Sequence, residues 1–586
     1  MSAVLEVREP GARYLSTPQP LLAREFDLMA TAPGGVARLR ELILTLAVQG
    51  KLVSQQQTDE PASILLKQIR AEKDRLIAQG KIKRDLPALP LLAEEMPFAL
   101  PVGWEWVRFG AIAGIERGGS PRPIQSFLTE AEDGLNWIKI GDTEKGGKYI
   151  TKVREKIRPE GLSKTRMVYQ GDFLLTNSMS FGRPYITQIN GCIHDGWLRI
   201  SPPSSLDKDY LYTLLSSTFI RKLFETAAAG GVVQNLNADK VRSVPIPMPP
   251  AEEQSRIVAR VEELMRLCDA LEAKGRLEAE QHARLLSTLL GTLTDSASPD
   301  ELATNWHRVA AHFDLLLDRP EAVDALEQTI LQLAVSGLLV PQESSDERAS
   351  VLCSRIQRHR KSRRKLVEAD PEAIAEADQP IPEGWVWASV DQLSADSETA
   401  IADGPFGANL KTEHYIASAG FRVIRLQNIG AGTFRDEHCA YIDEERFDRL
   451  GRHAVVAGDI VVAGLVDEAI RCCIVPTDIG KAIVKADCYR FAVHADLSAE
   501  YVCFYLSSAV AREFASIHHH GLTLTRIGLG NFRSIPVPVP PAAEQRRIVA
   551  RVVELRRLCA DLRQRLTASQ TTQTHLAEAL VESAIA

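Results

Sequence analysis

The stretch PIPMPPAEEQ at residues 245–254 occurs a second time as PVPVPPAAEQ at residues 536–545. The match continues to residues 271 and 562 at a constant offset of 291, with 19 of 27 positions identical and no gap. A proline run favours an extended backbone and cannot join a regular central strand. Proline is well tolerated at the start of a helix, where acidic residues also lie near the positive end of the helix dipole. Each copy therefore predicts an extended segment that leads into a helix.

Both predicted helices carry an apolar stripe with intervals of three or four residues, which is the spacing of one helical face. The stripe residues are Ile257, Val261, Leu264, Cys268 and Leu271 in the first copy and Ile548, Val552, Leu555, Cys559 and Leu562 in the second. Such a stripe usually marks core packing. Because one chain contains the stripe twice, we expect the two copies to pack on each other as a helix seam.

A second repeat precedes the first one along the chain. Residues 26–53 and 313–340 agree at 14 of 28 positions, at an offset of 287, and both copies read as a helix ended by a glycine. Charged helices are expected next, at Leu65–Gln79 and Val351–Glu368, followed by proline-rich linkers. Gly103-Trp104 and Gly384-Trp385 then open segments with β-like apolar runs that end at the proline signature.

This order predicts an α+β tandem protein with an internal pseudo-twofold repeat. The segments 104–244 and 385–535 agree at their ends but hardly in their interiors, so similar frames would present two heads with different surfaces. The expected parts are an N-terminal extension (1–25), a helical region (26–103), head 1 (104–244), a central helical region with a linker (245–384), head 2 (385–535) and a C-terminal helix (536–586).

Composition sets limits on the class of protein. The 586 residues are ordinary for a soluble protein, no run of about 18 apolar residues predicts a membrane span, and the N-terminus lacks a secretory pattern. Nine cysteines include no C-x-x-C pair, which favours a reducing cytoplasm. With a net charge of −7, any surface that binds nucleic acid must be local.

Catalytic machinery is not evident in the sequence. There is no G-x-x-x-x-G-K-[ST] phosphate loop, no Asn/Asp-Pro-Pro-aromatic loop of an amino-methyltransferase and no Cys/His set with the usual zinc spacing. We therefore expect no catalytic residue, no metal site and no cofactor bound by this chain.

Binding to nucleic acid has more support. Residues 137–170 carry nine Lys/Arg and four Asp/Glu, an excess of five positive charges that suits phosphate contacts, although an ordinary exposed strand surface is the alternative. Polar glycine-containing loops at 118–123, 177–184 and 403–411 can reach phosphates or base edges, but each alone is also an ordinary turn. The candidate DNA-binding residues are Arg122, Lys139, Lys145, Lys148, Ser178, Ser180 and Arg183 in head 1 and Asn409, Lys411, Arg425, Gln427, Asn428 and Arg526 in head 2.

These features together resemble the specificity subunit of type I restriction–modification systems, over about residues 26–586. The doubled P-x-P-x-P-P-A-x-E-Q-x-R-I-V-A-R-V-x-E-L signature, the D-G-P-F-G-A-N-L-K loop and the S-M-S-F-G-R-P loop carry the resemblance. It implies two target-recognition domains, each reading one half of a split, asymmetric DNA site, separated by long paired helices that form an antiparallel coiled coil. It also implies two modification subunits that methylate adenine N6 with S-adenosylmethionine, and up to two restriction subunits that use ATP and Mg, in a prokaryotic cytoplasm and away from membranes.

The expected helices fit that role. A helix of about 35 residues is roughly 50 Å long, which is on the scale of one to two DNA turns. Inserting residues in it should change the gap between the half-sites and leave both half-sites alone. Two alternatives remain open: a self-contained DNA-modifying enzyme with unrecognised motifs, and a coiled-coil assembly protein without DNA specificity.

Overall fold

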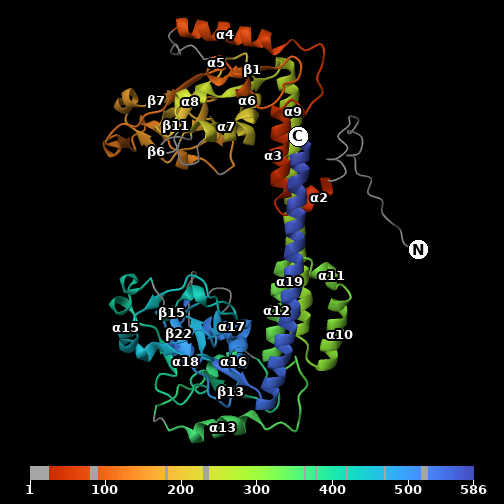
Figure 1. Cartoon of the computed structure of the whole chain (residues 1–586), viewed down its shortest axis with the longest axis vertical. Coiled ribbons are helices and arrows are strands. Elements are labelled where there is room, and N and C mark those ends of the chain that lie inside the picture. The colour runs from red at the N-terminus through yellow and green to blue at the C-terminus, as the bar shows by residue number, and fades with distance from the viewer. Residues whose placement is uncertain are drawn as a thin grey trace, which may run out of the picture. The chain divides into compact units, whose positions relative to one another are not determined.

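The computed structural model describes residues 26–79, 90–144, 146–177, 182–228, 236–361, 364–376, 379–417, 420–466, 470–516 and 525–585. The chain divides into two compact units: unit 1 is Met1–Leu277 with Gln570–Ala586, and unit 2 is Glu278–Ser569. In both units a helical region precedes a head of strands and short helices, and a long helix follows it (Figure 1). The predicted extension 1–25 lies outside the described residues.

Unit 1 places its helices before and after the strands of head 1. The helices are α2 (Phe26–Thr31), α3 (Gly35–Val48), α4 (Ala62–Ala78), α5 (Phe109–Ile112), α6 (Lys208–Ser216), α7 (Thr218–Ala228) and α8 (Ala238–Ser243). The repeat helix α3 is followed by Gly50 at a positive φ of 69°, and a Cβ there would lie 2.5 Å from Pro101 and 2.9 Å from Trp104. Glycine is therefore required both by the left-handed conformation and by the close packing.

Head 1 contains two five-stranded sheets among its described residues, with strand orders β3-β6-β4-β10-β7 and β2-β11-β8-β9-β5. The strands are β2 (Gly114–Arg117), β3 (Leu128–Thr129), β4 (Leu135–Ile138), β5 (Tyr149–Ile150), β6 (Glu155–Ile157), β7 (Arg166–Val168), β8 (Phe173–Thr176), β9 (Pro184–Thr187), β10 (Gly191–Ile193) and β11 (Trp197–Ser201). Strand β4 runs parallel to β10, and β11 lies antiparallel between β2 and β8.

Unit 2 repeats this plan with different residues. Its helices are α10 (Pro299–Ala310), α11 (Phe313–Leu316), α12 (Pro320–Val335), α13 (Ala349–His359), α14 (Pro371–Glu376), α15 (Glu444–Arg449), α16 (Ala499–Leu506), α17 (Ala509–Ser516) and α18 (Leu529–Ser534). Its strands are β14 (Ile401–Asp403), β15 (Phe421–Ile424), β16 (Tyr441–Ile442), β17 (Ala454–Val455), β18 (Ile460–Ala463), β19 (Leu465–Val466), β20 (Cys472–Ile474), β21 (Ala482–Val484), β22 (Cys488–Phe491) and β23 (Thr525–Arg526).

Four strands of each main sheet have the same order in the two heads although the interiors hardly match in sequence, and β3, β5, β19 and β23 have no counterpart among the described strands. In head 2 the sheet orders are β14-β22-β18-β20 and β16-β15-β21-β17, with β19 paired to β23. Strand β15 runs parallel to β21, as β4 does to β10, and β22 lies antiparallel between β14 and β18, as β11 does between β2 and β8. Equivalent strands can therefore be paired off between the heads, and residues after equivalent strands occupy equivalent places.

The proline signature forms the closing strand of each head. Strand β12 (Pro245–Met248) pairs antiparallel with β1 (Glu105–Arg108), and β24 (Pro536–Val539) pairs in the same way with β13 (Val386–Ser389). Each is a two-stranded sheet, so the missing proline N–H groups can face the side without a partner strand. The predicted extended segment before a helix is confirmed in both copies.

A buried glutamate joins each head to the start of its long helix. The carboxylate of Glu253, 1% exposed, accepts hydrogen bonds from Trp104 Nε1 at 2.9 Å and from Gln55 Nε2 at 2.7 Å. The same contacts recur in unit 2 at 3.0 and 2.6 Å, among Glu544, Trp385 and Gln342. Burial raises the pKa of both carboxyl groups. The repeated part of the sequence thus encodes a repeated set of buried polar contacts.

The apolar stripes do not form the expected seam, because they lie in two different hydrophobic clusters. The stripe of α9 (Ala251–Thr294) joins the core of unit 1, where Ile257 and Val261 share a cluster with Leu39 and Leu42 of α3. The stripe of α19 (Ala542–Ile585) joins the core of unit 2. In that core Ile548, Val552 and Cys559 are buried members, and Leu555 and Leu562 lie at the edge. Of the remaining stripe residues in unit 1, Cys268 is a buried member, Leu264 lies at the edge and Leu271 is half-buried.

The long helices nevertheless pair within each unit, through their opposite ends. Leu580 and Val581, near the end of α19, pack against the cluster that holds the start of α9. Leu286, Leu290 and Leu293, near the end of α9, belong to the cluster that holds the start of α19. Each helix has 44 residues, more than the expected 35 or so.

The charged helix of unit 2 is shorter than expected. Helix α13 ends at His359, where the prediction continued to Glu368. Arg360 donates hydrogen bonds to the backbone oxygens of Gln392 and Ser394, and Arg364 Nη2 lies 2.8 Å from the fully buried carboxylate of Asp391. These bonds of Arg360 and Arg364 to the head compete with further helix.

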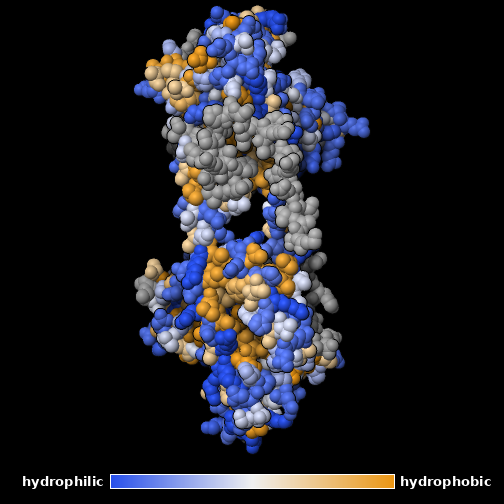
Figure 2. All heavy atoms as spheres, turned by 90° about the vertical axis from the view of Figure 1, so that its right-hand side faces the viewer, coloured by the Kyte–Doolittle hydropathy of each residue, from blue (hydrophilic) through white to orange (hydrophobic). Residues whose placement is uncertain are grey.

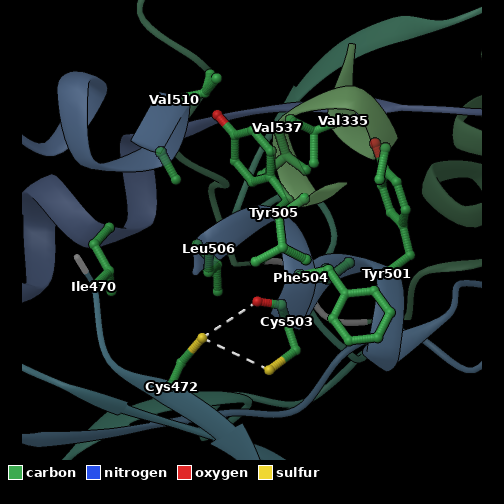
Figure 3. Packing of buried hydrophobic residues seen from close by; sticks show 14 of the residues in the cluster. Val335, Ile470, Cys472, Tyr501, Cys503, Phe504, Tyr505, Leu506, Val510 and Val537 are labelled. Carbon is green, nitrogen blue, oxygen red and sulfur yellow. Dashed lines mark hydrogen bonds between the residues drawn. The ribbon is translucent and has the colours of Figure 1, made fainter. Parts of the chain in front are cut away.

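Helix α16 supplies the centre of the unit 2 core. Its residues Tyr501, Tyr505 and Leu506 are almost completely buried (Figure 3). The Tyr501 hydroxyl donates to the backbone oxygen of Pro538 at 2.6 Å. Cys472 Sγ lies 3.6 Å from Cys503 Sγ in the same cluster, and all nine cysteines of the chain are free thiols. Tyr210 makes the matching bond to Pro247 in unit 1 at 3.1 Å.

Candidate nucleic-acid interface

Three segments of head 1 meet around one open cavity of about 900 Å³. The loop after β2 contributes Ser120 and Arg122, and the first residue after β4 is Lys139. The turn between β10 and β11 contributes His194 and Asp195. Two of the candidates chosen from sequence, Arg122 and Lys139, are therefore brought to one place by strand ends.

Asp195 is the fixed anion of this site. Its carboxylate accepts a hydrogen bond from Ser120 Oγ at 2.7 Å, and its backbone oxygen accepts from Arg117 Nε at 3.1 Å and Asn177 Nδ2 at 2.8 Å. The Ser120 hydroxyl, and then nearby positive charge, hold the pKa of Asp195 below its ordinary value. Arg122, whose side chain is 84% exposed, reaches the carboxylate with Nη2 at 3.6 Å. One exposed guanidinium thus lies near a hydrogen-bonded carboxylate.

Lys139 and His194 complete the site. The backbone N–H of Lys139 donates to Asp142 Oδ2 at 2.8 Å, and its ammonium lies 2.5 Å from Glu155. Burial lowers the pKa of His194, which keeps the imidazole neutral at pH 7. The charges of the site are therefore close to balance.

Equivalent segments meet in head 2. Phe406 belongs to the loop after β14, Arg425 follows β15, and Lys485 and Asp487 lie in the turn between β21 and β22. Arg526 Nη2, from β23, is 2.8 Å from Asp487 Oδ1, and its guanidinium lies 5.1 Å from the centroid of the Phe406 ring. An exposed arginine is again held against a carboxylate, but it comes from another part of the chain.

A second carboxylate distinguishes head 2. Asp403 Oδ2 lies 3.9 Å from Arg526, and burial raises the pKa of Asp403 to about 6, with Asp487 adding to the shift and Arg526 opposing it. The corresponding position in the strand register of head 1 is Arg117. The two sites thus differ in charge at equivalent places.

One candidate in head 2 needs correction. Asn428 is completely buried, and its side-chain amide donates to the backbone oxygens of Arg435 and Glu437 at 3.0 and 2.8 Å while its Oδ1 accepts the Arg425 N–H at 3.0 Å. All of these bonds fix the turn after β15, as Asp142 fixes the turn after β4, so no group of Asn428 is left for DNA. The sequence could not reveal this, because exposed and turn-fixing asparagines look alike.

The remaining candidates have mixed positions. Lys148 is bound inside the unit, with its ammonium 2.6 Å from Asp209 and 4.8 Å from the centroid of the Tyr212 ring. Arg425 donates to the backbone oxygen of His438. Exposed candidates are Arg183, Asn409, Lys411 and Gln427, and Lys145, Ser178 and Ser180 lie outside the described residues.

The basic stretch 137–170 is partly neutralised. Besides the ion pairs of Lys139 and Lys148, Arg166 Nη1 lies 2.9 Å from Glu116. Lys152, Arg154 and Arg158 are exposed. A phosphate-contacting surface over this stretch stays a prediction, with fewer available cations than the sequence suggested.

The residues that sequence reasoning missed are Ser120, Asp195 and Asp487, because the search for a DNA surface counted cations. A signal was present in the sequence. Arg199 and Arg490 occupy equivalent places in β11 and β22, where they pair with Asp172 and Asp459 at 3.1 and 2.8 Å. Aligning the heads on those arginines brings the two aspartates of the preceding turns within one residue of each other.

Neither metal ligands nor membrane spans are found in the part of the chain that the structure describes. No group of three or more His, Cys, Asp or Glu could hold a metal ion there. None of the helices described has the length and apolar character to cross a membrane.

The fold and the two sites define a tandem-repeat α+β protein with two heads of one topology and unlike surfaces. A family model for the type I restriction modification DNA specificity domain matches residues 101–281. The EcoEI specificity subunit of a type I restriction enzyme from Escherichia coli is 31% identical over 579 residues, and the EcoAI subunit from the same organism is 32% identical over 580 residues, with 94% of each chain covered in both cases. The chain belongs to the family of type I restriction enzyme specificity subunits.

Solved structures show a more distant likeness. The HsdS subunit from Thermoanaerobacter tengcongensis is 16% identical, with a TM-score of 0.35 over 83% of this chain and 98% of that chain. The relatives that are 31% and 32% identical confirm the family resemblance inferred from the repeats. The helices and sheets of the two units confirm the α+β class of the fold.

Proposed function

We propose that this chain is the DNA-specificity subunit of a type I restriction–modification complex and reads a bipartite, asymmetric site with one half-site for each head. One observation carries the proposal: the heads share a sheet topology but present different residues at equivalent positions of their sites. Lys139 corresponds to Arg425, and His194 to Lys485. Two such surfaces are suited to two different base sequences.

The long helices support a fixed gap between the half-sites. At 1.5 Å per residue, 44 residues make a helix of about 66 Å, which is on the scale of two turns of DNA. We propose that the number of residues in α9 and α19 determines the number of unread base pairs. Insertions in these helices would change the gap and leave the half-sites as they are.

Two equivalent surfaces support a scaffold for two identical partners. Leu267 of α9 and Leu558 of α19 lie at equivalent repeat positions and are 51% and 53% exposed. Exposed apolar side chains at matching sites suit two modification subunits, and up to two restriction subunits would join them. In this proposal the chain is non-catalytic, S-adenosylmethionine, ATP and Mg belong to the partners, and the complex works in the cytoplasm of a prokaryotic cell.

Base-resolved methylation mapping tests the proposal in cells that contain the chain and its modification subunit. The expected result is N6-methyladenine in both halves of one split motif. Replacing residues 104–244 by the matching segment of another family member should change one half only.

The alternatives predict other outcomes. Methyl transfer to DNA by the purified chain without partners would favour a self-contained enzyme and contradict a non-catalytic subunit. An assembled complex that binds DNA without sequence preference would favour a coiled-coil assembly protein.

A further inference from the structure

Each head holds one exposed arginine against a carboxylate that comes from the same turn of the topology. Asp195 lies two residues before β11, and Asp487 lies directly before the equivalent strand β22. Their partners, Arg122 and Arg526, come from different segments of the two heads. The same pair of groups is therefore assembled twice in different ways, although the sequences around it hardly agree.

The carboxylate of Asp195 and the backbone of Asp487 are held by hydrogen bonds. Asp195 is bound by Ser120 through its side chain and by two side chains through its backbone oxygen. Asp487 has a positive φ of 65°, and its backbone oxygen accepts the N–H of Gly464 at 2.7 Å. Each carboxylate attracts one edge of the guanidinium beside it, and the arginine side chains remain exposed, to 84% for Arg122 and 49% for Arg526.

The charge balance argues against a phosphate as the ligand of these arginines. Arg122 and Lys139 lie near Asp195 and Glu155, whereas Arg526 lies near Asp487 and Asp403. Phosphate binding relies on cations without nearby carboxylates, because it is driven by charge neutralisation and counterion release. A site in which carboxylates offset the arginine charge, with both donors and acceptors, is better suited to a base edge.

An oriented guanidinium selects one base edge. Its two parallel N–H groups match the O6 and N7 acceptors of guanine in the major groove, which is the commonest specific contact of arginine. The Phe406 ring beside Arg526 restricts that side chain further, and Pro121 and Pro123 flank Arg122 in the chain. Lysine has a similar charge but lacks the planar fork.

We propose that Arg122 and Arg526 each read one guanine, the first in the half-site of head 1 and the second in the half-site of head 2, and that Asp195 and Asp487 position them. The proposal rests on the function proposed above and adds one specified base to each half-site. It also explains why two heads with unlike surfaces keep a carboxylate in one turn.

The test uses the full chain assembled with its modification subunits on a double-stranded DNA library with randomised positions. Methylated molecules are sequenced, and the base preference is read at every position for Arg122→Lys, Arg122→Ala, Arg526→Lys and Arg526→Ala. A bidentate arginine–guanine contact gives about a 5- to 150-fold preference, so each change should remove a preference of that size at one guanine. The Arg122 variants should affect only the first half-site, and the Arg526 variants only the second.

Matched controls come from exposed arginine–carboxylate pairs elsewhere in the heads. Arg221 lies 4.0 Å from Glu225 in head 1, and Arg449 forms an ion pair with Glu445 in head 2. Arg221→Lys and Arg449→Lys should leave every base preference unchanged. A loss of preference in these controls would overturn the assignment.

Three outcomes contradict the proposal. A uniform loss of methylation with the motif unchanged would make Arg122 or Arg526 a phosphate contact. Relaxation at an adenine, cytosine or thymine would exclude guanine as the base. Relaxation of both half-sites by one change would exclude one base per head. A wild-type complex without any motif would instead refute the function proposed above, before the arginines are considered.

The positioning role has its own readout. Asp195→Asn and Asp487→Asn should weaken the preference at the same guanine as their arginines, and asparagine tolerates the positive φ of residue 487. In Arg122→Lys/Asp195→Asn the preference should be no weaker than in Arg122→Lys alone. An additive loss at a different base pair would show that Asp195 reads DNA by itself.

Discussion

The frames, which are the helical regions 26–103, 245–384 and 536–586, differ from the heads in what the two units have in common. In the frames, both sequence and contacts repeat: the two buried glutamates receive bonds from tryptophan and glutamine at distances that agree within 0.1 Å between the units. In the heads, the topology repeats but the residues do not. Buried hydrogen-bonded groups leave little freedom of sequence, whereas strand pairing needs only backbone and apolar alternation, so the head surface is free to differ.

The largest effect should come from the two tryptophans that donate to the buried glutamates. Trp104→Ala and Trp385→Ala each remove a buried ring and the donor to a buried carboxylate, and each should destabilise its own unit by about 3–5 kcal/mol. Urea unfolding followed by hydrogen exchange, read separately for each unit, measures the effect. Trp306→Ala, at a 41% exposed residue, is the control and should change stability by less than about 0.5 kcal/mol. If the two variants destabilised their units by different amounts, the repeated contacts would not be energetically equivalent.

Removing the acceptors should have a smaller effect of the same kind. Glu253→Ala and Glu544→Ala leave buried tryptophan and glutamine N–H groups without their partner, which should cost about 1–3 kcal/mol in either unit. Thermal unfolding of Glu252→Ala, at the exposed neighbour, provides the baseline. If the glutamate variants matched that baseline, the buried bonds would contribute nothing to the repeated frame.

The heads should respond to pH with opposite signs. The pKa of Asp403 is raised to about 6, so ionisation destabilises head 2, by about 2 kcal/mol, as the pH rises from about 4 to 6. Asp403→Asn should therefore raise the unfolding temperature at pH 8 and have no effect near pH 4. The pKa of Asp195 is lowered, so its stabilisation of head 1 is present at neutral pH and is lost as the pH falls through the folded pKa.

Thermal unfolding of Asp403→Asn and Asp195→Asn between pH 2 and 8 separates these two signs. Asp195→Asn should lower the unfolding temperature at pH 8, and the difference should shrink only below about pH 4, as the carboxyl group of the folded protein becomes protonated. The same sign for both variants would contradict the electrostatic difference between the heads.

The smallest effect concerns an ion pair whose polarity is reversed between the repeats. Arg40 of α3 lies 2.8 Å from Glu272 of α9, and at the equivalent positions Glu327 of α12 lies 3.1 Å from Arg563 of α19. Because these groups are largely exposed, Arg40→Glu should cost only about 0.5 kcal/mol, and less in high salt. Arg40→Glu/Glu272→Arg should recover in urea unfolding only the part due to Glu272, because Asp269, 2.6 Å from Arg40, still faces the new glutamate. A double variant no more stable than the single one would mean that the two residues do not interact.

The sequence predicts the frames well because their signals are local. A proline run with a helix start, a glycine after a helix and an apolar stripe each act within a few residues, and all three were found. The prediction that the two stripes pack on each other was wrong, because a helical period identifies the buried face of a helix but not the residues that cover it. Helix α13 ended early for the same reason: Arg360 and Arg364 bind groups about thirty residues away.

In the heads, the strand register and the carboxylates of the site could not be predicted from the sequence. Their strands are two to five residues long and pair across large separations, so no window of sequence contains the register. For the site, charge and loop composition found Arg122, Lys139 and Arg526, but they also selected Lys148, which is bound to Asp209, and Asn428, which is buried. The carboxylates that hold the arginines depend on the fold, since they come from other segments.

The central claim is that two heads of one topology read different half-sites. It is tested most directly by a chain in which residues 385–535 replace residues 104–244, assembled with its modification subunits and analysed by base-resolved methylation mapping. Two copies of head 2 in a pseudo-twofold frame should give a motif that contains the second half-site twice, as an inverted repeat, with the gap unchanged. A motif that still contains the original first half-site would contradict the account.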